Sequence, residues 1–111
     1  VQGMGWLTSE ELVWDARGRL ATHAPSTYKI PTAGDVPARW RVELLADSPN
    51  RSPTIHRSKA VGEPPLMLAL SVHHALRDAV ASLAPAGAPV TLRAPATPEA
   101  VLRAVRTARV R

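Results

Sequence analysis

One long stretch of this sequence lacks both proline and glycine, and it limits where a long helix can form. The 111 residues include 11 prolines and 6 glycines, but residues 66–84 contain neither. Pro64 and Pro65 precede the stretch, where proline is favoured in the first turn of a helix, and Pro85 follows it. We therefore predict one strong helix over residues 66–84. Its first turns are apolar on all sides, which is typical of a buried helix end, and its later apolar face is formed by Ala69, Val72, Leu76, Ala79, Val80 and Leu83.

A second helix is predicted at the C-terminal end of the chain. Thr97 is a favoured N-cap residue, and Pro98 suits the first helical position. Residues 85–97 contain several prolines and form the linker between the two helices. The chain is therefore expected to divide into residues 1–84, the linker 85–97 and a C-terminal helix over residues 98–111.

Short strands are predicted between the loops. Alternating apolar and polar residues over residues 40–45 indicate a strand with Trp40, Val42 and Leu44 on one face. Residues 90–92 are a candidate edge strand. The fold class is therefore expected to be α+β, with short strands and loops followed by two helices.

The first third of the chain is predicted to contain small local elements. In residues 1–7 two glycines alternate with bulky residues, which indicates either a strand or a close approach of the backbone to a ligand. We interpret Gln2 there as an ordinary polar residue. Residues 8–11 resemble a capped helical turn, residues 12–22 a small hairpin, and residues 23–36 an irregular loop.

The segment that leads into the long helix carries one carboxylate on a constrained backbone. Pro64 restricts Glu63 to extended dihedral angles, and Gly62 allows a bulky group to approach the backbone closely. A general base must lie within hydrogen-bond reach of the proton it takes, so a stiff support is useful. The helix N-terminus favours the anionic form of Glu63, whereas burial favours the neutral form, and both stay open. The alternative is an acidic residue that only stabilises a helix start.

The charge of the chain is basic, but its pattern does not indicate nucleic-acid binding. The formal net charge is +5, from 14 basic and 9 acidic residues. No aromatic residue is interleaved with the C-terminal basic cluster, so we interpret it as a solvated helix face. The cluster consists of Arg93, Arg103, Arg106, Arg109 and Arg111.

The metal-binding residue types are sparse. The chain has no cysteine, which excludes disulfides and iron–sulfur ligation by its own residues and fits a cytoplasmic protein. His73 and His74 are adjacent, so on a helix they point about 100° apart and cannot both face one metal ion. No spacing of His, Cys, Asp and Glu matches a zinc or calcium site, and we expect no metal ligand from this chain.

Several segments together resemble the molybdenum hydroxylases of the xanthine dehydrogenase family. Residues 58–70, SKAVGEPPLMLAL, resemble the C-terminal active-site segment of that family. Further matches lie at residues 2–12, 25–31, 41–50 and 94–102, in the order that the family has them. The resemblance implies that residues 1–84 are the C-terminal part of a molybdopterin-binding domain in a much larger subunit. It also implies that the isolated chain is inactive.

The resemblance implies a specific chemical role for Glu63. This residue would be the general base that takes the proton from the oxygen nucleophile at the molybdenum centre. Water would supply the oxygen, and hypoxanthine and xanthine would be oxidised to urate. Electrons would leave through iron–sulfur clusters and a flavin to NAD.

The implied cofactors and partners lie mostly outside this chain. Molybdenum–molybdopterin would be bound mainly by other residues, and 2Fe–2S clusters, FAD and NAD by partner domains or a partner subunit. The expected partners are the rest of the molybdenum subunit, the Fe–S/FAD subunit and a purine substrate, with neither nucleic acid nor membrane. Two alternatives stay open: an aldehyde oxidase or other hydroxylase of the same family, and a free-standing basic interaction domain without catalysis.

Overall fold

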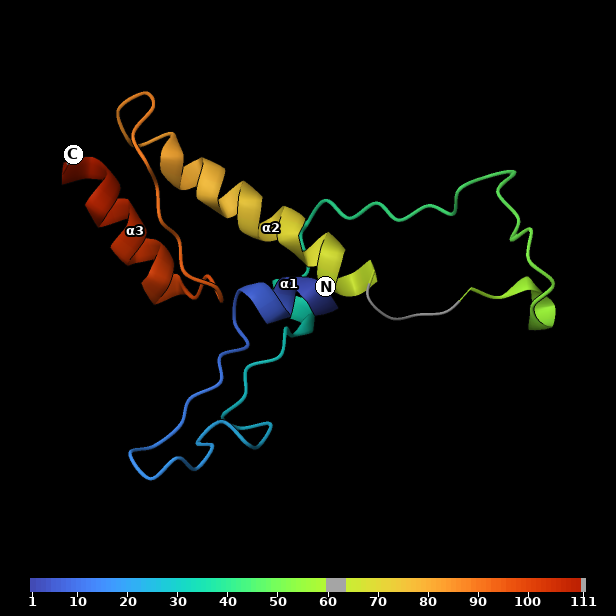
Figure 1. The fold of residues 1–111 in the computed structure, drawn as a ribbon, viewed down its shortest axis with the longest axis horizontal. Coiled ribbons are helices and arrows are strands. Elements are labelled where there is room, and N and C mark those ends of the chain that lie inside the picture. The colour runs from blue at the N-terminus through green and yellow to red at the C-terminus, as the bar shows by residue number, and fades with distance from the viewer. Residues whose placement is uncertain (60–63, 111) are drawn as a thin grey trace.

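The protein, described by a computed structural model over residues 1–59 and 64–110, is built around one long helix. Within these residues the α-helices are α1 over Gln2–Leu7, α2 over Pro64–Ala81 and α3 over Pro98–Val110. Two short 3-10 turns, η1 at Ala33–Asp35 and η2 at Ile55–Arg57, lie in the long connection between α1 and α2. α1 packs beside the first half of α2 and α3 beside its second half, so α2 joins the two ends of the chain (Figure 1).

α2 and α3 confirm the two predicted helices. α2 begins at Pro64, two residues before its predicted start, and ends at Ala81, three residues before its predicted end. α3 begins at Pro98, and the backbone N–H of Ala100 donates to Thr97 Oγ1 at 3.2 Å, as expected for an N-cap. A small core lies between the two helices and the connection that joins them, and it is formed by Val80, Leu92, Ala96, Ala104 and Ala108.

The prediction of a strand at residues 1–7 was wrong, because these residues form α1. Gly3 and Gly5 are buried in this helix. A Cβ added to Gly5 would meet the Glu10 carboxylate and would lie 2.5 Å from Pro31 Cδ, so only glycine lets the loop pack this closely. The predicted turn at residues 8–11 was also misplaced: the helix ends before it, where the Thr8 hydroxyl donates to the Met4 carbonyl at 2.6 Å.

Replacing Gly5 with alanine is expected to destabilise the folded domain. The added methyl group has no space beside the Pro31 ring, and overpacking of this kind costs about 1–3 kcal/mol. Gly34→Ala is the matched control, because a Cβ at Gly34 meets only Thr32 Oγ1, at an ordinary 3.7 Å. The thermal midpoint of the protein that carries this domain should therefore fall in Gly5→Ala and stay near the wild-type value in Gly34→Ala. Equal midpoints for the two variants would contradict the packing seen at Gly5.

The loop after α1 is held by polar contacts. The Tyr28 hydroxyl donates to Glu10 Oε2 at 2.5 Å, and this hydrogen bond raises the pKa of Tyr28 because it favours the protonated phenol. At the far end of the loop the backbone N–H of Thr32 donates to Asp35 Oδ2 at 2.8 Å. That hydrogen bond lowers the pKa of the Asp35 carboxyl by favouring its charged form. The irregular loop predicted at residues 23–36 is therefore confirmed. It contains η1 and a hydrogen-bonded turn at residues 25–27, where the Tyr28 N–H donates to the Ala24 carbonyl at 2.8 Å.

The predicted hairpin is present, but its strands are minimal. Trp14 and Leu20 form an isolated antiparallel bridge, and the Ala21 N–H donates to the Val13 carbonyl at 2.7 Å. Gly18, at φ +74°, forms the turn. In the part of the chain that the structure describes, residues 40–45 and 90–92 are not paired as strands. The helices of the predicted α+β class are thus present, and within residues 1–59 and 64–110 its sheet is represented only by this bridge.

The chain is more extended than a compact domain of its size. Its radius of gyration is 18.2 Å, whereas about 13 Å is expected for a compact chain of this length. The connection between α1 and α2 runs far out from the helices (Figure 1). The first turns of α2, predicted to be buried, are exposed in this chain: Met67 is 63% and Leu68 is 70% accessible, and only Ala69 nearby is buried. The described residues therefore lack a cover for the apolar end of α2.

Candidate functional site

The predicted catalytic residue, Glu63, and its neighbour Gly62 lie outside the described residues. The structure describes the chain on both sides of them, from Ser58 and Lys59 before to α2 after. The candidate site is therefore defined by the turn that precedes this segment and by the groove beside the first half of α2.

The turn before the segment is closed by its own polar side chains. Asn50 Nδ2 donates to the Ser58 carbonyl at 3.0 Å and to Thr54 Oγ1 at 3.1 Å. The Thr54 hydroxyl donates to the same Ser58 carbonyl at 2.7 Å. His56 and Arg57 both have left-handed backbone conformations, with φ of 50° and 55°. Because L-residues rarely adopt this conformation, the hydrogen bonds around Asn50 are what hold the turn.

A groove of about 450 Å³ lies between α1 and the first half of α2. Gln2 and Met4 line it from α1, Leu68 and Ser71 from α2, and Trp40 from the connection. Leu68 is five positions after Glu63 in the sequence, so this groove is close to the predicted base along the chain. Ser71 donates its hydroxyl to the Leu68 carbonyl at 2.6 Å. The Gln2 amide, which can donate and accept, lines the groove without a hydrogen-bond partner among the described residues.

The sequence alone did not identify Gln2 as a groove residue. Its position depends on the contact between α1 and α2, which are separated by more than fifty residues. The available signal was the pair of glycines at positions 3 and 5, which indicates a close approach of the backbone. The approach is made to other parts of this chain, namely Glu10 and Pro31 in the case of Gly5.

Metal-ligand clusters are absent from the described residues: no three His, Cys, Asp or Glu side chains are grouped to hold an ion. His73 and His74 are adjacent on α2, with ring centroids 6.1 Å apart and planes at 80°. Nε2 of His73 is buried and has no hydrogen-bond partner among the described residues. The two rings therefore lie edge to face.

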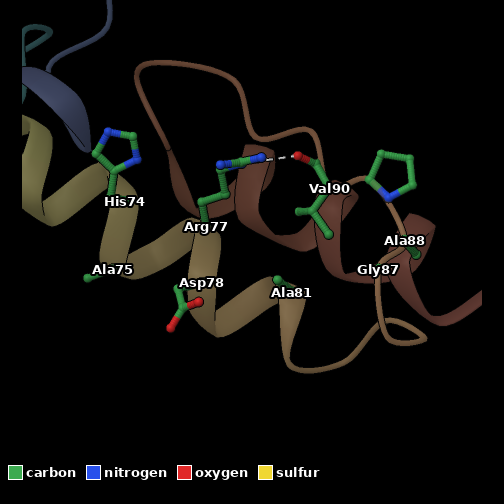
Figure 2. A pocket seen from close by; sticks show the side chains of 9 residues that line it. His74, Ala75, Arg77, Asp78, Ala81, Gly87, Ala88 and Val90 are labelled. Atoms are coloured by element: carbon green, nitrogen blue, oxygen red, sulfur yellow. Dashed lines mark hydrogen bonds between the residues drawn. The ribbon is translucent and has the colours of Figure 1, made fainter.

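A larger cavity lies beside the second half of α2, against the linker. It has a volume of about 720 Å³ and is lined by His74, Arg77 and Asp78 of α2 and by residues 87–90. Arg77 Nε donates to the Val90 carbonyl at 3.2 Å, and Asp78 points away from Arg77 (Figure 2). The arginine thus fixes the linker to the helix.

The arginines of α3 lie on its outer face. Ala104 and Ala108 are buried against the rest of the chain, whereas Arg106 and Arg109 are exposed. Arg103 Nη2 lies 2.6 Å from Glu99 Oε1, an exposed pair one helical turn apart that contributes little to stability. Among the described residues no helix is long and apolar enough to cross a membrane.

Comparison with known proteins identifies the relatives of this chain. Residues 1–37 match the family model described as a molybdopterin cofactor-binding domain. The chain is 49% identical to a xanthine dehydrogenase/oxidase of Felis catus, in a match that covers 94% of this chain and 8% of that protein. It is 55% identical to a xanthine dehydrogenase of Dictyostelium discoideum (72% and 6% covered) and 45% identical to xanthine dehydrogenase 1 of Arabidopsis thaliana (91% and 8%). The chain thus spans less than a tenth of the length of these relatives.

Proposed function

Because this chain belongs to the xanthine dehydrogenase family, as a segment of a molybdenum hydroxylase, we propose that it is the C-terminal part of a molybdopterin-binding domain. The observation that carries this proposal is the 49% sequence identity to the Felis catus protein, in a match that covers 94% of this chain. The intact domain would have the α+β class, with its sheet completed by polypeptide outside the described residues. The exposed apolar end of α2 supports this, since such surfaces usually mark contacts with another part of the protein.

We propose that the groove between α1 and α2 contacts one edge of the molybdopterin cofactor. Its lining offers the Gln2 amide, which can both donate and accept hydrogen bonds, beside the apolar surfaces of Met4 and Trp40. The described residues of its lining include no carboxylate, thiolate or imidazole side chain, so these residues would contact the organic part of the cofactor and leave the metal to other ligands. When bound, the cofactor supplies the oxidation–reduction chemistry. Most of its contacts would come from outside this chain.

Glu63 would act as the general base of the reaction. A carboxylate in hydrogen-bond reach of the oxygen nucleophile takes its proton as that oxygen attacks the substrate carbon, and water is the source of the oxygen. The sequence SKAVGEPP around Glu63 and its position just before the groove-lining residues of α2 support this role. We propose hypoxanthine and xanthine as the substrates and urate as the final product, with electrons passed through 2Fe–2S and FAD to NAD in other domains or a partner subunit. The cytoplasm is the proposed location.

A substrate screen of the intact enzyme tests the proposed substrate class. Xanthine and hypoxanthine should be oxidised, with urate as product, and aliphatic and aromatic aldehydes should be turned over far more slowly. The measurement is steady-state kcat/KM for each compound with the same enzyme preparation. Efficient oxidation of aldehydes without oxidation of xanthine would identify an aldehyde oxidase instead and would leave the role of Glu63 unaffected.

A further inference from the structure

Residues 38–44 carry a backbone without hydrogen-bond partners among the described residues. No backbone N–H or carbonyl of this stretch forms a hydrogen bond there, and a turn at residues 46 and 47 follows it. Pro37, just before the stretch, cannot donate, and proline is typical of the margins of strands. Because unpaired backbone groups are costly once they are buried, such a stretch either stays in water or pairs with another chain segment.

The side chains of this stretch alternate between two kinds of face. Val42 is 71% and Leu44 is 97% accessible, so their apolar side chains have no cover. Between them, Arg41 and Glu43 form a two-pronged ion pair, with Arg41 Nε 2.8 Å from Glu43 Oε1 and Nη2 2.9 Å from Oε2. In an extended chain residues two positions apart lie on the same side, so the ion pair lies opposite Val42 and Leu44. Leu45, which is 82% accessible, lies on the side of the ion pair at the end of the stretch. This is the pattern of a strand with one buried and one solvated face.

We propose that residues 40–45 form a β-strand in the intact protein by adding to the edge of a sheet that the rest of the same polypeptide provides. Strand addition accounts for both the unpaired backbone and the exposed apolar face. It pairs the backbone groups with the partner strand and buries the face of Val42 and Leu44, while the ion pair stays in water. The inference rests on the proposed function in one respect, namely that this chain is a segment of a longer protein. That longer protein supplies the partner, because the chain spans only 8% of the length of relatives such as that of Felis catus.

The partner strand also bears on the candidate site. Trp40, the first residue of the proposed strand, is one wall of the groove between α1 and α2. Pairing of residues 40–45 would therefore fix the indole against this groove. A second copy of the chain is the competing partner, because an unpaired apolar strand is a template for association between copies.

Hydrogen–deuterium exchange of the intact protein tests the proposal directly. The amides of residues 40–45 should exchange at least ~10²-fold more slowly in the intact protein than in the isolated 111-residue chain at low concentration. Equal, fast exchange in both would overturn the proposal. Protection that appears only in the isolated chain, and rises with its concentration, would also overturn it and would identify a second copy as the partner.

Two neighbouring substitutions in the intact protein give the matched comparison. Leu44→Gln places a polar amide on the face proposed to be buried, so it should lower the thermal midpoint and increase exchange at residues 40–45. Glu43→Gln changes the solvated face and should leave both close to the wild-type values. Equal effects of the two substitutions would reject the assigned faces. Neither readout uses turnover, so an intact protein with a protected strand but no purine oxidation would reject the proposed function and keep this inference.

Discussion

Replacement of Glu63 by glutamine in the intact enzyme is expected to reduce kcat by at least ~10²-fold, with molybdenum and molybdopterin contents unchanged. Glutamine keeps the size and shape of the side chain, but its amide cannot take a proton at neutral pH. The loss should therefore appear in the chemical step and should leave cofactor loading intact. The measurements are steady-state turnover of xanthine and metal and pterin analysis of the same preparation. Glu63→Ala should lose at least as much.

Glu99→Gln is the control that separates a base from a helix-start residue. Glu99 lies in the first turn of α3 and directly follows a proline, whereas Glu63 directly precedes the proline at which α2 begins. If Glu63 only stabilised a helix N-terminus, each of the two substitutions would lower the free energy of unfolding by about 0.3–1 kcal/mol. Neither substitution would then change turnover. Near-normal turnover of a fully loaded Glu63→Gln enzyme would reject the catalytic role.

Local signals in the sequence were sufficient for the helices that carry the fold. Residues 66–84 lack proline and glycine, and the prolines on either side place both ends of α2 within three residues. Thr97 and Pro98 mark the start of α3 correctly because capping is a local interaction between neighbouring residues. The residues buried between these helices were only partly predicted: Val80 is buried, whereas Leu83 of the same predicted face is 43% accessible.

Features that depend on distant contacts could not be predicted in the same way. The alternation of two glycines with bulky residues over residues 1–7 suggested a strand, whereas these residues form α1, and the close packing of Gly5 against Glu10 and Pro31 was not visible in the sequence pattern. The place of Gln2 in the groove depends on the contact of α1 with α2. The role of Glu63 came from resemblance to a family, and it stays a prediction because that residue lies outside the described part of the chain.

The 111 residues on their own are expected to unfold without a sharp transition. In the described residues only six apolar side chains are buried, and four of them are alanines. Each buried methyl group contributes about 0.8 kcal/mol, which is small beside the entropy of ordering a chain of this length. The 13-residue α3 is marginal in water on its own, and the 18-residue α2, like most helices in proteins, gains most of its stability from the packing of an apolar face. The chain alone should therefore retain partial helix and lack a cooperative core.

Circular dichroism and tryptophan fluorescence, followed during heating, measure this cooperativity. The isolated chain should show broad changes that do not coincide, whereas the intact protein should show a steep transition. Val80→Asp is a second test of the same expectation. A charge buried between α2 and α3 should change the isolated chain little and should strongly destabilise the intact protein, because Val80 is 3% accessible.

A single sharp transition of the isolated chain, together with salt-sensitive binding of nucleic acid, would instead favour a free-standing basic domain. The exposed arginines of α3 would then form the binding surface.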